Sequence, residues 1–174
     1  DIVAEQVDGV LYLNDELSEN RVEDIKKMFN SNGIPFVFAN VVSDDPDVPT
    51  VSIDYEKAGY EITKLLINDQ RQNVYLLSTA RRYSVNDKKE AGYARAMEEA
   101  GLEPKIFRTS GDTNINRQHF STFFSDKKID AAIGVRDSIA VSFMNIARDN
   151  GRHVPKDLAI AGFQNTKYAL FTCF

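Results

Sequence analysis

The sequence predicts an α/β fold with parallel sheets flanked by helices. Short apolar runs bounded by polar or turn residues alternate with longer stretches along most of the chain. In those stretches apolar residues recur at the spacing of one helical face. Regular alternation of strand and helix favours parallel sheets covered on both faces. With 174 residues and 43% hydrophobic content, the chain is long enough for one α/β core.

The expected elements follow from these runs in chain order. The strands are predicted at residues 10–13, 36–39, 51–53, 74–77, 106–107, 131–135 and 159–161. Helical spacing is clearest at residues 22–29, 58–66, 120–124 and 137–149. Val154 and Pro155 are expected to end the helix before the final strand, because proline lacks a backbone donor and disfavours helical geometry in the preceding residue. Gly162 and Phe163 then turn the chain out at the carboxyl end of that strand.

Composition excludes several classes of protein. The net charge of −5 has the wrong sign for a surface that neutralises the phosphates of DNA. No apolar run approaches the roughly 20 residues that span a bilayer, and the first residues lack the features of a signal peptide. We therefore expect a soluble, cytoplasmic protein. The single cysteine, Cys173, has no internal partner and fits a reducing compartment.

Enzyme chemistry has little support in the sequence. His119 and His153 have no nucleophile or metal-ligand spacing near them. The motifs of serine hydrolases, phosphate-binding loops and dinucleotide-binding turns are absent. We expect a chain that is not an enzyme and has no catalytic residue, cofactor or metal.

Candidate binding residues lie in the loops after the predicted strands, because ligands of open parallel sheets bind beyond the carboxyl ends of the strands. These loops are residues 14–16, 40–44, 54–55, 78–87, 109–113, 136–137 and 164–166. Helix capping is the competing explanation for Asp54 and Asp137, and for Asn86 or Asp87 before the next helix.

Basic residues form a second candidate feature. Lys88 and Lys89 are expected in the first turn of a helix, where the helix dipole disfavours cations. A small anion such as a sugar phosphate would offset this; the alternative is a solvated basic edge paired with Asp87 and Glu90. The basic group consists of Arg81, Arg82, Lys88, Lys89 and Arg136.

Three segments resemble a known family. The run HVPKDLAIAGFQNT at residues 153–166, VSIDYEKAGYEITKLLI at 51–67 and EAGYARAMEEAGLEP at 90–104 resemble the effector-binding core of LacI/GalR-type transcription repressors. The resemblance implies a type I periplasmic-binding-protein-like fold. Within the family, the sequence of these segments most resembles the subfamily that governs carbon catabolite repression in Gram-positive bacteria.

The resemblance also implies a division of the chain. Residues 1–70 would be the later part of the first subdomain, 71–165 most of the second, and 166–174 the crossover segment. It begins partway into the core, so we expect a fragment that lacks the helix-turn-helix headpiece and the first strands. Operator DNA would then be bound only through that headpiece.

The family's effector pocket maps onto this chain residue by residue. Lys89, Arg136 and Gln164 stand where sugar- and purine-responsive members have Arg, Asn or a similar residue, and Asp. Glutamine offers one carbonyl oxygen beside two donors, so the usual neutral sugar is in doubt and a sugar phosphate or other anion is a candidate. The full set of expected effector-binding residues is Asp54, Ser78, Arg81, Lys89, Arg136, Asp137 and Gln164.

Helix 137–149 has a wider apolar surface than packing on a sheet requires. It is either enclosed by its neighbours or part of a subunit interface, which the family's dimers place there. We expect a homodimer with Val141, Met144 and Tyr168 at the contact. The subfamily resemblance adds the serine-phosphorylated carrier protein of the sugar phosphotransferase system as a partner.

Two other classes stay open at this stage. A periplasmic-type sugar-binding protein shares the architecture and would carry a signal peptide upstream. A flavodoxin-like α/β enzyme or receiver domain would show turnover, or phosphorylation at Asp54.

Overall fold

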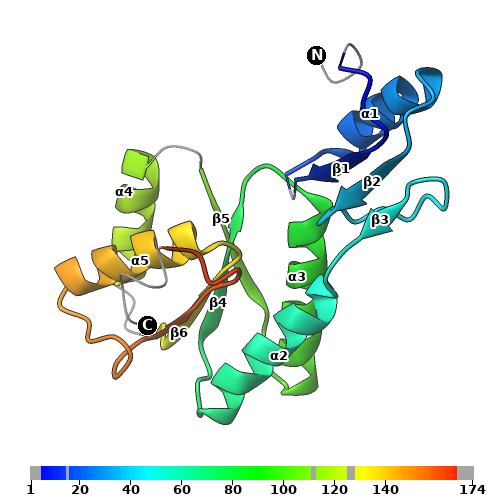
Figure 1. The fold of residues 1–174 in the computed structure, drawn as a ribbon. Helices are drawn as coiled ribbons and strands as arrows, with labels where there is room; N and C mark the ends of the chain where they lie inside the picture. The colour runs from blue at the N-terminus through cyan, green and yellow to red at the C-terminus, as the bar shows by residue number, and fades with distance from the viewer. Residues whose placement is uncertain (1–4, 15, 111–112, 125–127, 168–174) are drawn as a thin grey trace. The chain divides into compact units, whose positions relative to one another are not determined.

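The computed structural model describes residues 5–14, 16–110, 113–124 and 128–167 (Figure 1). The chain forms two compact units, one of residues 1–55 with 82–88 and one of residues 56–81 with 89–174. Both units contain a parallel sheet, packed against one helix in the first unit and between helices on both faces in the second, which confirms the α/β prediction.

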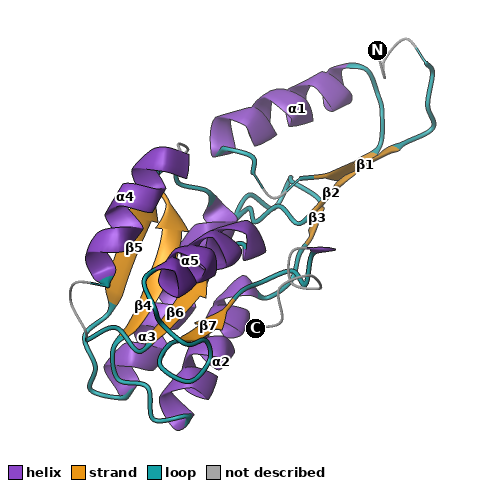
Figure 2. Ribbon diagram, turned by 90° about the vertical axis from the view of Figure 1, so that its left-hand side faces the viewer, coloured by secondary structure: helices purple, strands orange, loops and turns teal. Residues whose placement is uncertain are grey.

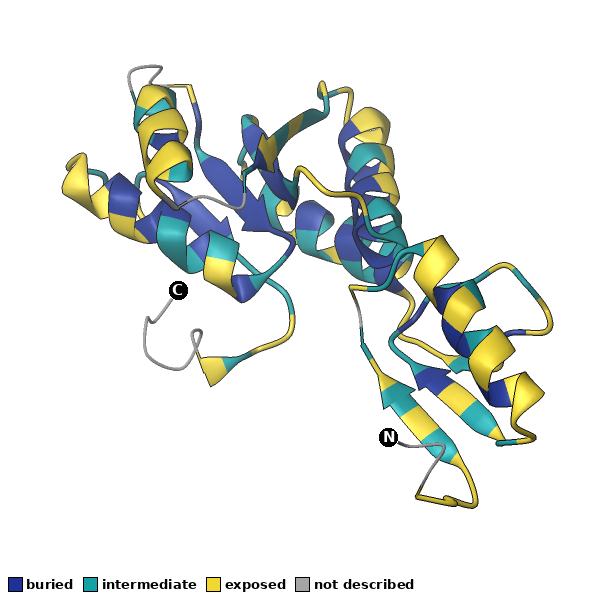
Figure 3. Cartoon of the chain, turned by 90° about the horizontal axis from the view of Figure 1, so that it is seen from above, coloured by how far each residue is buried: buried dark blue, intermediate teal, exposed yellow. Residues whose placement is uncertain are grey.

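The first unit is a three-stranded sheet with one helix. Its strands lie in the order β1 (Val10–Leu13), β2 (Phe36–Ala39) and β3 (Thr50–Val51). Helix α1 (Glu19–Ser31) buries Val22, Ile25 and Phe29 against one face of the sheet. Leu11 and Leu13 alternate with half-buried residues along β1 and are exposed. Figure 3 shows this alternation of burial along the strands of the first unit. This sheet is therefore covered by α1 on one face only within the described residues.

The second unit is a four-stranded sheet with helices on both faces (Figure 2). Across the sheet its strands are β5 (Lys105–Thr109), β4 (Val74–Thr79), β6 (Ala131–Gly134) and β7 (Ala159–Ala161). Its helices are α2 (Tyr55–Asn68), α4 (Thr113–Phe123), α5 (Asp137–Asp149) and the part of α3 (Ser84–Glu99) from Lys89 onward. Residues of α2 and α3 pack with Leu76 and Ile133 on one face, and residues of α4 and α5 pack with Leu77 and Ala132 on the other.

The boundary between the units differs from the expected division at residue 70. Helix α2 belongs to the second unit from Glu56 onward. It packs directly on α3, because a Cβ atom at Gly59 or Gly92 would overlap a backbone oxygen of the other helix. Arg95 also forms an ion pair with Glu56 at 2.6 Å. Contact between the two helices at glycines places α2 with the sheet that follows it in the chain.

Two element boundaries and the cause of one helix end also differ from expectation. Strand β3 ends at Val51, so residues 52 and 53 are not strand. Helix α5 ends at Asp149 as its spacing predicts, but Gly151 ends it and not Val154 and Pro155, because Gly151 adopts a φ of 75° and donates its N–H to the Arg148 carbonyl. Helix α3 begins at Ser84, so Asn86 and Asp87 lie inside the helix and do not cap it.

None of the helices among the described residues combines the length and apolar character needed to cross a membrane.

Candidate functional site

The carboxyl ends of β4, β5, β6 and β7 lie at the same edge of the second sheet, because the strands are parallel. The segments that leave this edge contain Arg81, Arg136 and Gln164, three of the residues expected to bind an effector. Gln164 and Arg81 are exposed, and Arg136 is half-buried. These residues are accessible at the edge where open parallel sheets bind ligands.

Asp137 is fixed inside this edge. It is the first residue of α5 and is 2% exposed. Its Oδ2 atom accepts hydrogen bonds from the backbone N–H of Thr166 at 2.6 Å and from the Thr166 hydroxyl group at 2.8 Å. The side chain joins the start of α5 to the segment after β7. Among the described residues, its hydrogen bonds run to Thr166 and not to the amides of its own helix, so capping does not explain it.

Lys89 is also turned inward. It lies in the second turn of α3 and not in the first, and it is 1% exposed. Its Nζ atom donates a hydrogen bond to the Val135 carbonyl at 2.9 Å and lies 4.7 Å from the centre of the Phe163 ring. A buried ammonium group needs such partners, since burial of an unpaired charge is costly. Lys89 therefore connects α3 to the ends of β6 and β7. Its ammonium group points into the interior, whereas an effector-binding side chain was expected to face solvent.

Ser78 takes part in a buried polar network. Its hydroxyl group donates to Glu90 Oε1 at 2.5 Å, and the two nitrogens of the Arg108 guanidinium bind the two oxygens of Glu90 at 2.8 and 2.7 Å. Ser78 is fully buried and Glu90 is 7% exposed. This network ties β4, α3 and β5 together. The Ser78 hydroxyl group is therefore engaged inside the unit.

Sequence reasoning did not single out Glu90, Arg108 and Phe163 as parts of one edge. Arg108 is one of the exposed positions of β5, which alternate with more buried ones, and its partner Glu90 lies 18 positions away in the chain. Only the charge of Glu90 on the inner side of a helix gave a signal that a buried partner was needed.

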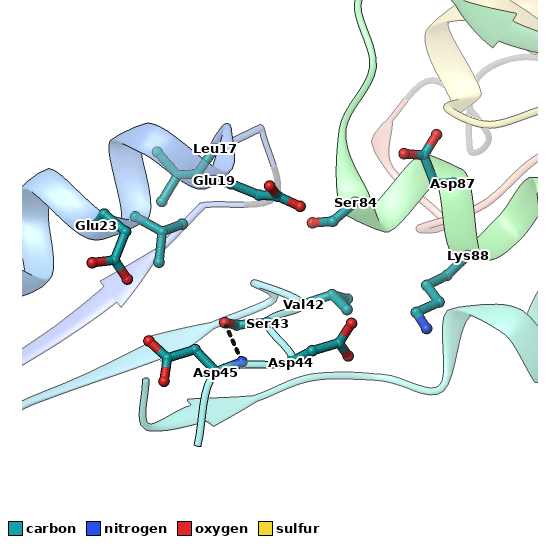
Figure 4. A pocket seen from close by; sticks show the side chains of 11 residues that line it. Leu17, Glu19, Glu23, Val42, Ser43, Asp44, Asp45, Ser84, Asp87 and Lys88 are labelled. Atoms are coloured by element: carbon teal, nitrogen blue, oxygen red, sulfur yellow. Dashed lines mark hydrogen bonds between the residues drawn. The ribbon is translucent and has the colours of Figure 1, made fainter. Parts of the chain in front are cut away.

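The first unit contains a pocket of about 380 Å³ that Asp54 does not line (Figure 4). Its wall comes from the start of α1, the loop after β2 and the first turns of α3. Figure 4 shows the side chains of Glu19, Asp44, Ser84 and Lys88 around a common space. The complete lining is Leu17, Glu19, Val22, Glu23, Val42, Ser43, Asp44, Asp45, Ser84, Asp87 and Lys88.

Carboxylates outnumber cations around this pocket. Asp45 accepts a hydrogen bond from Lys26 at 2.5 Å, which lowers the pKa of the Asp45 carboxyl group and raises the pKa of Lys26. Asp87 is paired with Arg82 at 2.8 Å. Lys88 is the one basic residue in the lining. Among the described residues, no group of carboxylates is arranged to hold a metal ion. Of the expected basic group, Lys89 is buried and Arg82 is paired with Asp87.

The residues expected at a dimer contact have different positions. Met144 is fully buried in the core with Phe120 and Phe143, so it cannot face a partner subunit. Val141 is half-buried on α5. Tyr168 and Cys173 lie outside the described residues. The wide apolar surface of α5 is explained largely by burial between the sheet and α4, visible in Figure 3 as the dark stretches of that helix.

Comparison with known proteins gives consistent results. The model of one family, the periplasmic binding proteins and sugar binding domain of the LacI family, matches residues 2–170. Catabolite control protein A of Priestia megaterium is 30% identical over 171 residues, which are 95% of this chain and 50% of that protein. The HTH-type transcriptional regulator pepR1 of Lactobacillus delbrueckii subsp. lactis is 31% identical over 170 residues, which are 97% and 50%.

Among solved structures, a complex of the transcriptional regulator CelR with cellobiose matches with a TM-score of 0.78 at 22% identity, over 97% of this chain and 52% of that chain. The chain spans about half the length of the curated relatives it matches.

Proposed function

Because the chain belongs to the family of periplasmic binding proteins and LacI-type sugar-binding domains, we propose that it senses a small effector on behalf of a transcription regulator. The family match confirms the resemblance drawn from the sequence. It is a family of binding domains and not of enzymes. The function is therefore to bind and to transmit the bound state.

One observation carries this proposal. Arg136 and Gln164 are presented at the carboxyl edge of the second sheet, in segments held from inside by the buried side chains of Lys89 and Asp137. An edge with accessible polar side chains on a rigid buried base is what a small polar ligand requires. Arg136 supplies donors, and Gln164 has both donors and an acceptor.

We propose a neutral polyhydroxyl effector, a sugar, in place of the sugar phosphate that the sequence made a candidate. Lys89 is buried, so it does not add a cation for an anion to meet. The structure of the CelR–cellobiose complex has this fold, so cellobiose is a suitable first probe.

A transcription regulator is favoured over a periplasmic sugar-binding protein because the curated relatives described above are a catabolite control protein and a transcriptional regulator. A cytoplasmic location follows from that role. Operator DNA would be bound through a helix-turn-helix headpiece, since this chain has a net charge of −5. Two such chains would form a homodimer that matches a two-fold symmetric operator.

Catabolite control is the finer proposal. It rests on the lysine at position 89 and on the amino-acid sequence of the segments that resemble that subfamily. Identity does not discriminate, because catabolite control protein A and pepR1 match at 30% and 31%. In this proposal a serine-phosphorylated carrier protein of the phosphotransferase system is a second partner.

The mechanism needs no chemical step. An effector that binds one arrangement of the protein more tightly than another shifts the population toward it by the difference in binding free energy. The affinity for DNA changes by the same coupling free energy. DNA binding in turn changes the affinity for the effector by the same factor.

Thermal-shift measurements on the purified protein test the proposal. Cellobiose, other neutral sugars, glucose 6-phosphate and the phosphorylated carrier protein are added separately, because a molecule that binds the folded state raises the Tm by mass action. We expect a neutral sugar to raise the Tm. A rise with glucose 6-phosphate alone would restore the anion hypothesis, and a rise with the carrier protein alone would remove the small-molecule effector.

A further inference from the structure

The segment that leaves β7 has an unusual backbone. Gln164 and Asn165 have φ values of 85° and 47°, so two successive residues other than glycine occupy the left-handed region. An L-residue in this region is sterically disfavoured, because its Cβ atom crowds the following carbonyl oxygen. Both residues are exposed. The residues on each side of the pair, Phe163 and Thr166, contact buried side chains.

Two buried charges hold the pair, one on each side of it. After the pair, Asp137 Oδ2 accepts both the N–H and the hydroxyl group of Thr166, at 2.6 and 2.8 Å. Before the pair, the Phe163 ring lies 4.7 Å from the Nζ atom of Lys89. Asp137 and Lys89 are 2% and 1% exposed, so both are fixed in the interior of the unit.

Gly162 shows that the second oxygen of Asp137 is also closely enclosed. A Cβ atom at Gly162 would lie 2.6 Å from Asp137 Oδ1. The carboxylate therefore fills the space beside Gly162 with one oxygen and binds Thr166 with the other.

We propose that Asp137 is a positioning residue that forces Gln164 and Asn165 into the left-handed conformation and so sets where Gln164 stands at the carboxyl edge. The positioning itself is independent of any ligand. The use of Gln164 to read the effector rests on the proposed function, and the two are tested separately.

A double-mutant cycle on stability tests the positioning without a ligand. Gln164→Gly removes the steric cost of the left-handed conformation, so we expect the Tm of the otherwise unchanged protein to rise by about 2 °C. In the Asp137→Ala background nothing imposes that conformation, and the same glycine substitution is expected to change the Tm by less than about 0.5 °C. Equal gains in both backgrounds would overturn the proposal, because a purely structural aspartate would give additive effects.

Thr166→Val provides a second cycle if Asp137→Ala does not fold. Valine has the shape of threonine but lacks the hydroxyl donor. The rise in Tm caused by Gln164→Gly is therefore expected to be smaller in the valine background than in the otherwise unchanged protein, but larger than in Asp137→Ala. Thr166→Ser keeps the donor and serves as the control. Hydrogen exchange of the Thr166 amide is a parallel measurement, and we expect at least about a tenfold acceleration in Asp137→Ala. An unchanged gain in the valine background, or unchanged exchange, contradicts the proposal.

The effector role is tested with cellobiose as the probe. If Gln164→Gly binds cellobiose as well as the unchanged protein while the stability cycle is non-additive, Asp137 still positions the segment and only the assignment of Gln164 to the effector fails. If the stability cycle is additive and cellobiose binding is lost, the proposed function stands and the positioning role is wrong.

Discussion

Tyr93 joins two strands at the amino end of the second sheet, opposite the candidate site. Its hydroxyl group donates to the Val74 carbonyl at 2.8 Å and accepts the Lys105 N–H at 2.7 Å. The residue is fully buried, and burial raises the pKa of its phenol group to about 12. Tyr93→Phe leaves a buried carbonyl and a buried N–H without this partner. We expect it to lower the free energy of unfolding by about 2 kcal/mol, measured by urea denaturation.

The raised pKa of Tyr93 gives this loss a pH dependence. An unfolded tyrosine ionises near pH 10, whereas folded Tyr93 keeps its proton up to about 12. Between these values the unfolded state binds fewer protons than the folded state, so stability falls as the pH rises. The difference in stability between the wild-type protein and Tyr93→Phe is therefore expected to shrink as the pH increases above about 10. A constant difference across that range would show that burial does not hold the proton on Tyr93.

Lys26 and Asp45 form an ion pair that shifts the pKa values of both groups. The Lys26 ammonium group holds the pKa of Asp45 below its ordinary value. The contribution of Asp45 to stability is then present above the ordinary aspartate pKa and is lost as the pH falls through the lowered folded pKa. Lys26→Met is expected to raise the pKa of Asp45 in a titration of side-chain carboxyl groups by NMR. Asp157, whose pKa is lowered mainly by the His153 N–H, is the internal reference and should not change.

At the scale of elements, contact between α2 and α3 decides which helix belongs to which unit. Gly92 faces the Glu56 carbonyl so closely that a Cβ atom has no space. Gly92→Ala must push the helices apart, and we expect a loss of about 1–3 kcal/mol in the free energy of unfolding. Ala91 is exposed on the same helix, so Ala91→Ser is a matched control with an expected change below about 0.5 kcal/mol. A glycine variant as stable as its control would mean that the helices do not meet there.

The sequence was informative about elements because strand and helix periods are local. The runs at residues 10–13, 36–39 and 159–161 are strands at the predicted bounds, and α5 has the predicted bounds. The position of α2 beside α3 has no periodic signature in the sequence, because it depends on contacts of Gly59 and Gly92 with residues at least 30 positions away in the chain.

The candidate site was predicted less well for a related reason. Position at a strand end correctly placed Arg136 and Gln164 at an exposed edge. It could not tell that Lys89 and Ser78 turn inward, because their partners, Val135 and Glu90, lie on other elements. Whether a polar residue at a strand end faces solvent or the interior is decided by tertiary contacts.

At the scale of the whole molecule, Val141 tests the proposed homodimer. It is half-buried on α5, whereas Met144 on the same helix is fully buried within the chain. Val141→Arg adds a charge that an apolar subunit contact would have to desolvate, so we expect a shift from dimer to monomer in sedimentation velocity. Asn145→Arg on the exposed side of α5 is the control. If both variants sediment as the wild-type protein does, α5 does not form the contact.

Calorimetric titration of neutral sugars into the protein tests the central claim, that the chain binds an effector at the carboxyl edge of its second sheet. We expect a sugar identified by thermal shift to bind the wild-type protein and Tyr93→Phe with equal affinity, because Tyr93 lies at the opposite edge. Arg136→Ala and Gln164→Gly should each weaken binding by about tenfold, the loss expected for one or two polar contacts. Consumption of the sugar, or undiminished binding in both edge variants, would contradict the account.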